Sequence, residues 1–210
     1  MEIAILLFDE LTALDAVGPY EVLSRLPGAS VSFVAAQPGP QRTENRMLAL
    51  HADLALEQVV SPEIVVIPGG IGTRSLLADR QILDWIRRVH STSLWTTSVC
   101  TGSLLLAAAG LLDGLEATGH WLAMDTLAAL GAEPVSRRIV QQGKIITGAG
   151  VSAGIDMALR LAAKVAGPEW AQAIQLGIEY DPQPPFVGGS VGTAPPEIVE
   201  LVRARANGLI

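Results

Sequence analysis

The stretch Leu94-Trp-Thr-Thr-Ser-Val-Cys-Thr-Gly-Ser-Leu-Leu-Leu-Ala-Ala-Ala109 contains Cys100, the only cysteine among the 210 residues of the chain. The residues before Cys100 predict a buried strand, and those after it, rich in Leu and Ala, predict a helix. A cysteine at such a junction lies in the field of the helix N-terminus, near amide groups that lack partners within the helix. That field favours the thiolate, which is the nucleophilic form, so we expect one activated sulfur.

Strand-like and helix-like segments alternate along the rest of the chain. Predicted strands span residues 2–8, 30–36, 47–51, 63–67 and 94–99, with a hairpin of 138–141 and 144–147. Predicted helices span residues 15–26, 81–90, 102–111, 121–130, 152–165, 169–176 and 197–206. Apolar strands separated by helices predict an α/β fold, with a mostly parallel sheet covered by helices on both faces. Ligands bind at the carboxyl ends of such strands, here after Phe8, after Ile67 and at Cys100.

The composition limits the class of protein. Half of the residues are hydrophobic and 17% are charged, which predicts a large core and a single domain over residues 1–210. The net charge of −7 argues against nucleic acid as a partner, since phosphate binding needs clustered Lys and Arg. A lone cysteine forms no internal disulfide, which fits a reducing cytoplasm.

Two apolar segments raise the question of a membrane. Residues 1–8 predict a strand rather than a signal peptide, because they lack a basic region and a small-residue cleavage site. Residues 94–112 approach the length of a membrane span, but hydroxyl side chains interrupt them and no basic flank follows. We therefore expect a cytoplasmic protein with no membrane partner.

The glycine-rich segment Pro68-Gly69-Gly70-Ile71-Gly72 follows a predicted strand. Glycines let backbone amides approach a ligand and form a concavity that binds anions. The segment is not a phosphate-binding P-loop, because no Gly-Lys-Ser/Thr follows. It is either a simple turn or, beside a reactive thiol, an oxyanion hole.

Asp15 follows the first strand, on the side where the glycine segment and the thiol should gather. One interpretation is a helix N-cap, for which Asp is a preferred residue. The other is an acid/base group, because a carboxyl close to a thiolate in an apolar environment has a raised pKa and can give and take a proton.

The histidines suggest no metal site. Thr101, not a histidine, follows Cys100, and His120 in Ala117-Thr-Gly-His-Trp121 is the one histidine in a turn that could line a pocket. For His120, a core or capping role is favoured over catalysis. No His, Cys, Asp or Glu residues have metal-ligand spacing, so we expect neither metal nor cofactor.

Three motifs together make the chain similar to the ThiJ/PfpI superfamily, and within it to isonitrile hydratases. They are Leu14-Asp-Ala-Val-Gly-Pro-Tyr-Glu-Val22, Ser98-Val-Cys-Thr-Gly-Ser103 and Ile178-Glu-Tyr-Asp-Pro-Gln-Pro-Pro-Phe186. The resemblance covers nearly the whole chain. It implies a flavodoxin-like three-layer sandwich, a single domain of the class I glutamine amidotransferase-like type, and a homodimer with active sites close to the subunit contact.

The resemblance also implies the chemistry. Cys100 would be the nucleophile, Asp15 the acid/base and Thr101 a hydroxyl that positions the site. The substrate would be bound by Gly70, Ile71, Gly72, the N–H of Val151, and His120. Such an enzyme, a hydro-lyase, adds water to a small-molecule isonitrile through a cysteine thioimidate and releases an N-substituted formamide.

Three other activities of similar proteins were weighed against this one. Proteases and amidases pair the cysteine with an adjacent histidine, and Thr101 stands in that position. Glyoxalase-like relatives usually carry a glutamate where this chain has Asp15, which argues against a glyoxalase-like activity. This activity nevertheless stays an alternative, because it also uses an activated thiol. A non-catalytic redox or ligand sensor that uses the same cysteine is another, since similar domains form part of some transcriptional regulators and an exposed low-pKa thiol oxidises readily.

Overall fold

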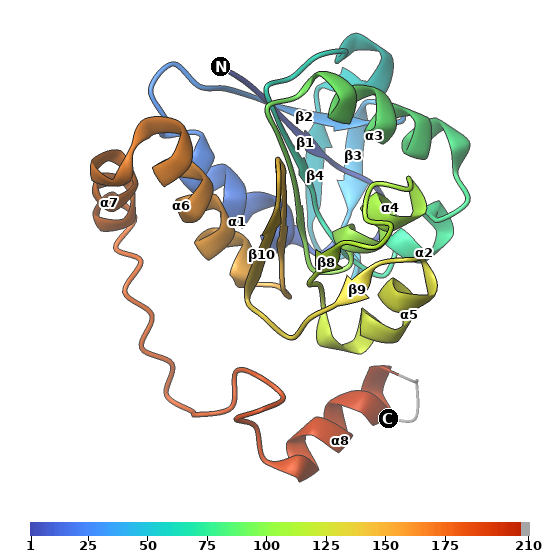
Figure 1. Ribbon diagram of the computed structural model, residues 1–210, viewed down its shortest axis with the longest axis vertical. Coiled ribbons are helices and arrows are strands. Elements are labelled where there is room, and N and C mark those ends of the chain that lie inside the picture. The colour runs from blue at the N-terminus through green and yellow to red at the C-terminus, as the bar shows by residue number, and fades with distance from the viewer. Residues whose placement is uncertain (207–210) are drawn as a thin grey trace. The chain divides into compact units, whose positions relative to one another are not determined.

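The computed structural model describes residues 1–206, which divide into two compact units, Met1–Ile178 and the segment that begins at Glu179. The first unit contains a seven-stranded sheet in the order β10-β11-β7-β6-β1-β2-β5 (Figure 1). Its strands are β1 (Glu2–Leu6), β2 (Ser30–Ala35), β5 (Leu54–Ala55), β6 (Ile64–Ile67), β7 (Trp95–Val99), β10 (Ile139–Gln142) and β11 (Ile145–Gly148). Neighbouring strands are parallel except in the β10–β11 hairpin. The prediction of a mostly parallel sheet is confirmed.

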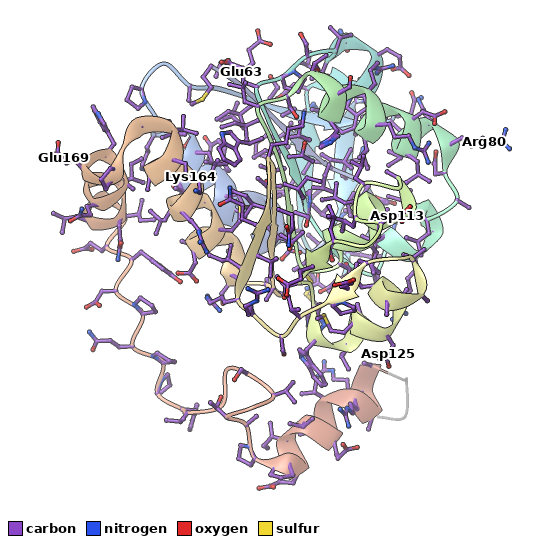
Figure 2. All side chains as sticks on the ribbon, in the orientation of Figure 1. Glu63, Arg80, Asp113, Asp125, Lys164 and Glu169 are labelled. Carbon is purple, nitrogen blue, oxygen red and sulfur yellow. The ribbon has the colours of Figure 1, made fainter. Side chains whose placement is uncertain are left out.

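Helices cover both faces of this sheet (Figure 1). One layer contains α1 (Ala13–Leu23), α6 (Ala153–Ala166) and α7 (Pro168–Gly177), and the other contains α3 (Arg80–Thr92), α4 (Gly102–Ala108) and α5 (Met124–Ala129). The chain therefore has the α/β three-layer sandwich that the sequence predicts. Charged side chains such as Arg80, Asp113 and Glu169 lie at the periphery, while side chains fill the space between the layers (Figure 2).

The first layer is close-packed because two glycines let helices α1 and α6 approach each other. A Cβ atom at Gly18 would lie 3.1 Å from the Ile155 side chain, and one at Gly154 would lie 3.1 Å from Val99 in β7 and 3.3 Å from Pro19. This packing joins the helix that follows β1 to the helix that follows β11.

Shorter elements complete the first unit, and here the sequence-based expectations are less accurate. They are β3 (Gly39–Arg42), β4 (Ala49–Ala52), η1 (Leu56–Gln58), α2 (Thr73–Leu76), β8 (Glu116–Ala117), η2 (Trp121–Ala123) and β9 (Glu133–Pro134). The strand expected at 47–51 is β4, which pairs with β3, an element that was not predicted. The single helix expected over 121–130 consists of the 3-10 turn η2 followed by α5.

The second unit contains irregular backbone and α8 (Pro196–Ala206), none of whose described residues is buried. Within residues 1–206, no helix combines the length and the apolar character that a bilayer crossing requires.

The topology brings three strand ends together. Strands β7, β6 and β1 are consecutive in the sheet, and β1 lies between β6 and β2, so the chain reverses its order of winding there. The loops at the carboxyl ends of parallel strands near such a reversal form the usual ligand site of open α/β sheets.

Candidate active site

Asp15, in the first turn of α1, follows β1, while the segment Gly69–Gly72 and Cys100 lie in the loops that follow β6 and β7. Their hydrogen bonds interlock: the N–H of Gly69 donates to Asp15 Oδ2 at 2.9 Å, and the N–H of Gly70 donates to Thr101 Oγ1 at 2.9 Å. The three segments that the sequence analysis selected therefore meet at one place.

Cys100 occupies a strained position at the turn between β7 and α4. Its φ of +59° lies in the left-handed region, which a non-glycine residue adopts at a cost in energy. Its N–H donates to the carbonyls of Gly148 and Ala149, at 3.1 and 3.2 Å. Gly102 lets the next turn pass against the Ile67 carbonyl, which a Cβ atom would overlap. The surrounding structure thus holds the cysteine in this conformation.

Asp15 lies inside the first turn of α1 and does not cap the helix. Thr12 is the N-cap residue, and the Asp15 side chain, which is fully buried, is directed to the Gly69 amide instead. Its Oδ1 atom makes no hydrogen bond of standard geometry with the described residues, although the carboxyl is close enough to the Cys100 thiol for the two groups to influence each other. The N-cap interpretation of Asp15 is therefore wrong.

Burial controls the acid–base properties of this pair. It raises the pKa of Asp15 to about 7, against the opposing hydrogen bonds from Gly69 and Cys100. Burial, and then the charge of Asp15, raise the pKa of the Cys100 thiol well above its usual value, while hydrogen bonds from Thr101 oppose this rise. Cys100 is only 4% exposed.

The sequence predicted that the field of the helix N-terminus favours the thiolate, but burial raises the pKa of Cys100 instead. Helix α4 has seven residues, and the amides at its N-terminus favour a thiolate. The loss of solvation of a thiolate in this nearly closed site has a larger effect on the pKa of Cys100 and opposes them. The charge of Asp15 also opposes ionisation of the sulfur, so the protonation states of the two groups are coupled.

Thr101 connects the cysteine turn to the glycine segment. Its hydroxyl accepts from the Gly70 N–H at 2.9 Å and lies 3.1 Å from the Gly70 carbonyl, to which it donates. Hydrogen bonding from its amide and hydroxyl also favours the ionised sulfur of Cys100. The hydroxyl has one hydrogen, so it divides this donation between the carbonyl and the sulfur.

The glycine segment does not present a row of free amides. The Gly69 and Gly70 amides bond to Asp15 and Thr101, and the Gly72 amide donates to the Glu10 carbonyl at 3.1 Å. The oxyanion hole expected from Gly70 and Gly72 is therefore not formed by these amides, because the neighbouring loops already accept their hydrogen bonds. Ile71, 49% exposed, is the member of the segment that projects outward.

Gly69 belongs to the glycine segment that the sequence indicated, but no role in the site was predicted for it. A Cβ atom there would lie 2.5 Å from the Thr101 nitrogen and 2.9 Å from Asp15 Oδ2. Only a residue without a side chain fits between the two partners of Cys100. The signal that could have identified it is the adjacent pair Gly69-Gly70 directly after a buried strand.

His120 and Val151 belong to two further turns beside the cysteine. His120 caps η2 by accepting the Leu122 N–H on Nδ1 at 3.3 Å, and its ring packs so closely on Gly150 that a Cβ there would overlap it. Burial lowers the pKa of His120, so the ring is neutral at pH 7 with its proton on Nε2. Val151, half-buried, follows Gly150 and precedes Ser152, the N-cap residue of α6.

The described residues offer no metal centre: no group of three or more His, Cys, Asp or Glu side chains within residues 1–206 could hold an ion.

The chain is similar in sequence and in fold to known proteins. An isonitrile hydratase of Pseudomonas putida is 44% identical over 206 residues, covering 98% of this chain and 90% of that protein. The solved structure of a ThiJ/PfpI family protein from Pseudomonas syringae has a TM-score of 0.93 and 36% identity, and the match covers 98% of this chain and 86% of that one.

A transcriptional regulator also matches. The HTH-type regulator CdhR of Pseudomonas aeruginosa is 30% identical over 168 residues, covering 78% of this chain but 49% of the regulator. The family model described as "DJ-1/PfpI family" matches residues 1–164, which include all of the loops that form the site. The chain belongs to the DJ-1/PfpI family.

Proposed function

We propose that this protein is an isonitrile hydratase-like enzyme, a hydro-lyase that adds water to a small-molecule isonitrile and releases an N-substituted formamide. The observation that carries the proposal is the buried Asp15–Cys100 pair, in which a carboxyl with a pKa of about 7 meets the only thiol of the chain. The similarity to the P. putida isonitrile hydratase over 98% of the chain supports it.

The pair holds one proton above neutral pH. Two negative charges cannot share a site in which Asp15 is fully buried and Cys100 is 4% exposed without a large loss of solvation. The proton resides on the sulfur or on the carboxyl, and the two forms titrate as a unit. The form with the proton on Asp15 leaves a thiolate beside a carboxylic acid.

This form matches the reactivity of an isonitrile. The terminal carbon of the substrate accepts a proton and a nucleophile at the same atom. The Cys100 thiolate forms an S–C bond to that carbon while Asp15 delivers its proton to it, which gives a thioimidate and an Asp15 carboxylate.

The second half-reaction restores the enzyme. The Asp15 carboxylate takes a proton from water, and the hydroxide oxygen bonds to the thioimidate carbon. A proton from the new hydroxyl moves to nitrogen, the C–S bond breaks, and the sulfur leaves as thiolate while the carbon becomes the formyl group. Asp15 is then protonated again, so one water is consumed for each isonitrile.

The other site residues have supporting roles in this proposal. Thr101 stabilises the thiolate through its amide and hydroxyl, and Gly70 and Gly72 hold the loop around the pair. Ile71, Val151 and the neutral His120 would contact the substrate. The enzyme would need no cofactor and would act as a homodimer in the cytoplasm.

Steady-state assays with cyclohexyl isocyanide and with methylglyoxal test the function. We expect formamide from the isocyanide, its loss in Cys100→Ala, and a decrease of about 10²-fold or more in Asp15→Asn, which keeps the Gly69 hydrogen bond but cannot transfer a proton. Turnover of methylglyoxal alone would favour the glyoxalase-like alternative. Oxidation of Cys100 at micromolar peroxide without isonitrile turnover would favour the sensor.

A further inference from the structure

The turn after β3 carries an exposed acid, Glu44, on a well-ordered scaffold. The Thr43 N–H donates to the Leu48 carbonyl at 2.9 Å, which closes the turn. Asn45 Oδ1 accepts from Thr43 Oγ1 at 2.9 Å and from the Met47 N–H at 3.1 Å. The position of Glu44 is therefore fixed by hydrogen bonds at both ends of the turn.

This turn is tied to the loop that leads into Asp15. The Glu44 N–H donates to the Leu11 carbonyl at 3.2 Å, and Thr12 Oγ1 donates to Glu44 Oε2 at 3.2 Å. The Thr12 N–H in turn donates to the Gly69 carbonyl at 2.9 Å, and the Gly69 N–H to the Asp15 carboxylate. Hydrogen bonds of Thr12 and Gly69 thus link the Glu44 carboxylate to the loops that hold Asp15.

The charge of Glu44 is not neutralised locally, because none of the ion pairs found within residues 1–206 includes it. The Cys100 thiol, in the turn before α4, and the Glu44 carboxylate, held at the N-cap residue of α1, both influence Asp15. Glu44 also faces His120, in the turn before η2. After the larger effect of burial, the negative charge of Glu44 further raises the pKa of Asp15.

We propose that Glu44 is a positioning residue for the proton of the pair: its carboxylate, held by Thr12, keeps the shared proton on Asp15 and the charge on the Cys100 sulfur. The consequence for turnover rests on the proposed function; the effect on the sulfur does not. Nothing in the proposal requires Glu44 to touch the substrate.

The pH dependence distinguishes this role from a structural one. At low pH both groups are protonated, and the reactive form arises when the thiol alone loses its proton, a step that leaves the proton of Asp15 in place. Above the pKa of Asp15, about 7, the reactive form arises when the proton moves from sulfur to carboxyl. Glu44 assists that move. Its removal therefore lowers the rate above neutral pH and leaves the rate at low pH unchanged.

The test is the rate of alkylation of Cys100 by iodoacetamide as a function of pH. Cys100 is the only cysteine, so the reaction reports one sulfur and requires no isonitrile. For Glu44→Gln we expect an alkylation rate equal to that of wild type near pH 5.5 and about threefold lower on the alkaline plateau. The midpoint of the rate profile should also move to lower pH. Glu44→Asp, which keeps the charge, should follow the wild type.

Two controls complete the design. Glu10→Gln removes the charge of an exposed acid in the loop that precedes Thr12, and its profile should match the wild type. In about 1 M salt, where charges are screened beyond roughly 3 Å, the wild-type plateau should fall toward that of Glu44→Gln.

Superimposed profiles for Glu44→Gln and wild type, or a decrease by the same factor at every pH, would overturn the inference. The kcat/KM for cyclohexyl isocyanide, measured in the same variants, separates the two proposals. If no variant turns over the isocyanide while alkylation behaves as expected, the hydratase proposal fails and the role of Glu44 stands.

Discussion

At the scale of single residues, the chemistry of the site depends on a carboxyl and a thiol that share one environment. The sequence predicted that Asp15 and Cys100 lie close together, because each follows a strand whose carboxyl end reaches the same edge of the sheet. The charge state of the sulfur could not be predicted, since it depends on how completely the loops from other strands exclude water. The sequence indicated the helix N-terminus that favours a thiolate, but it did not indicate the burial that raises the pKa of Cys100.

Gly69 provides a sharp test of this environment. In Gly69→Ala the new Cβ would lie 2.5 Å from the Thr101 nitrogen and 2.6 Å from its hydroxyl, so Thr101 or Asp15 must move. Displacements of about 1 Å in a catalytic group reduce rates by about 10²-fold, and we expect a decrease of this size in kcat/KM.

The matched control for this substitution is Gly177→Ala, at the end of α7, where an added Cβ meets nothing within 4 Å. It should keep wild-type activity. Wild-type kinetics in Gly69→Ala would show that the positions of Thr101 and Asp15 around Gly69 do not constrain catalysis.

At the scale of elements, the long helices and strands of the sheet were predictable because their apolar patterns are continuous. Helix α3 buries Ile82, Ile86 and Val89 at helical spacing, and every residue of β6 is buried. Strand β3, Gly39–Arg42, has no such pattern: its residues are exposed or half-buried, and it exists because it pairs with β4. The 3-10 start of the segment 121–130 likewise reflects the cap made by His120.

The close packing of α1 and α6 holds in place the helix that carries Asp15. Gly154→Val should separate α6 from Val99 and Pro19, which a Cβ at this position would contact at 3.1 and 3.3 Å. We expect the free energy of unfolding to fall by about 1–3 kcal/mol, as for other overpacked cores. Urea denaturation measures this change.

The kinetic consequence follows from the connection of these helices to the loops. Helix α1 carries Asp15, and Val151 lies two residues before the start of α6, so kcat/KM should fall together with stability. Gly189→Val, in a segment where an added Cβ meets nothing within 4 Å, should change the free energy of unfolding by less than about 0.5 kcal/mol. An equal effect of both substitutions would contradict the packing argument.

At the scale of the whole molecule, the buried acid of the site should destabilise the folded state. The pKa of Asp15 rises from 3.8 to about 7 on folding, so between these values the unfolded chain has lost a proton that the folded chain keeps. The contribution of Asp15 to stability is then present in full below pH 3.8, falls as the pH rises to about 7, and is constant above it.

Asp15→Asn removes this dependence. Relative to wild type, the variant should gain about 4 kcal/mol in free energy of unfolding between pH 4 and pH 8, the equivalent of the rise in the pKa of Asp15 from 3.8 to about 7. Urea denaturation of both proteins across this range gives the difference. A difference that does not change with pH would mean that Asp15 titrates as it would in water.

Whether residues 1–210 act as a single domain stays a prediction, since the structure divides into units at Ile178. The same holds for the homodimer. Both depend on surfaces that the apolar pattern of one chain does not specify, whereas the layered core of Met1–Ile178 follows from that pattern.

Mass spectrometry of the protein quenched with acid during turnover of cyclohexyl isocyanide tests the central claim most directly. The covalent mechanism predicts a peptide containing Cys100 whose mass has increased by that of one isocyanide, and no such peptide from Cys100→Ser. Formamide production by Cys100→Ser at the wild-type rate, without any adduct, would contradict it.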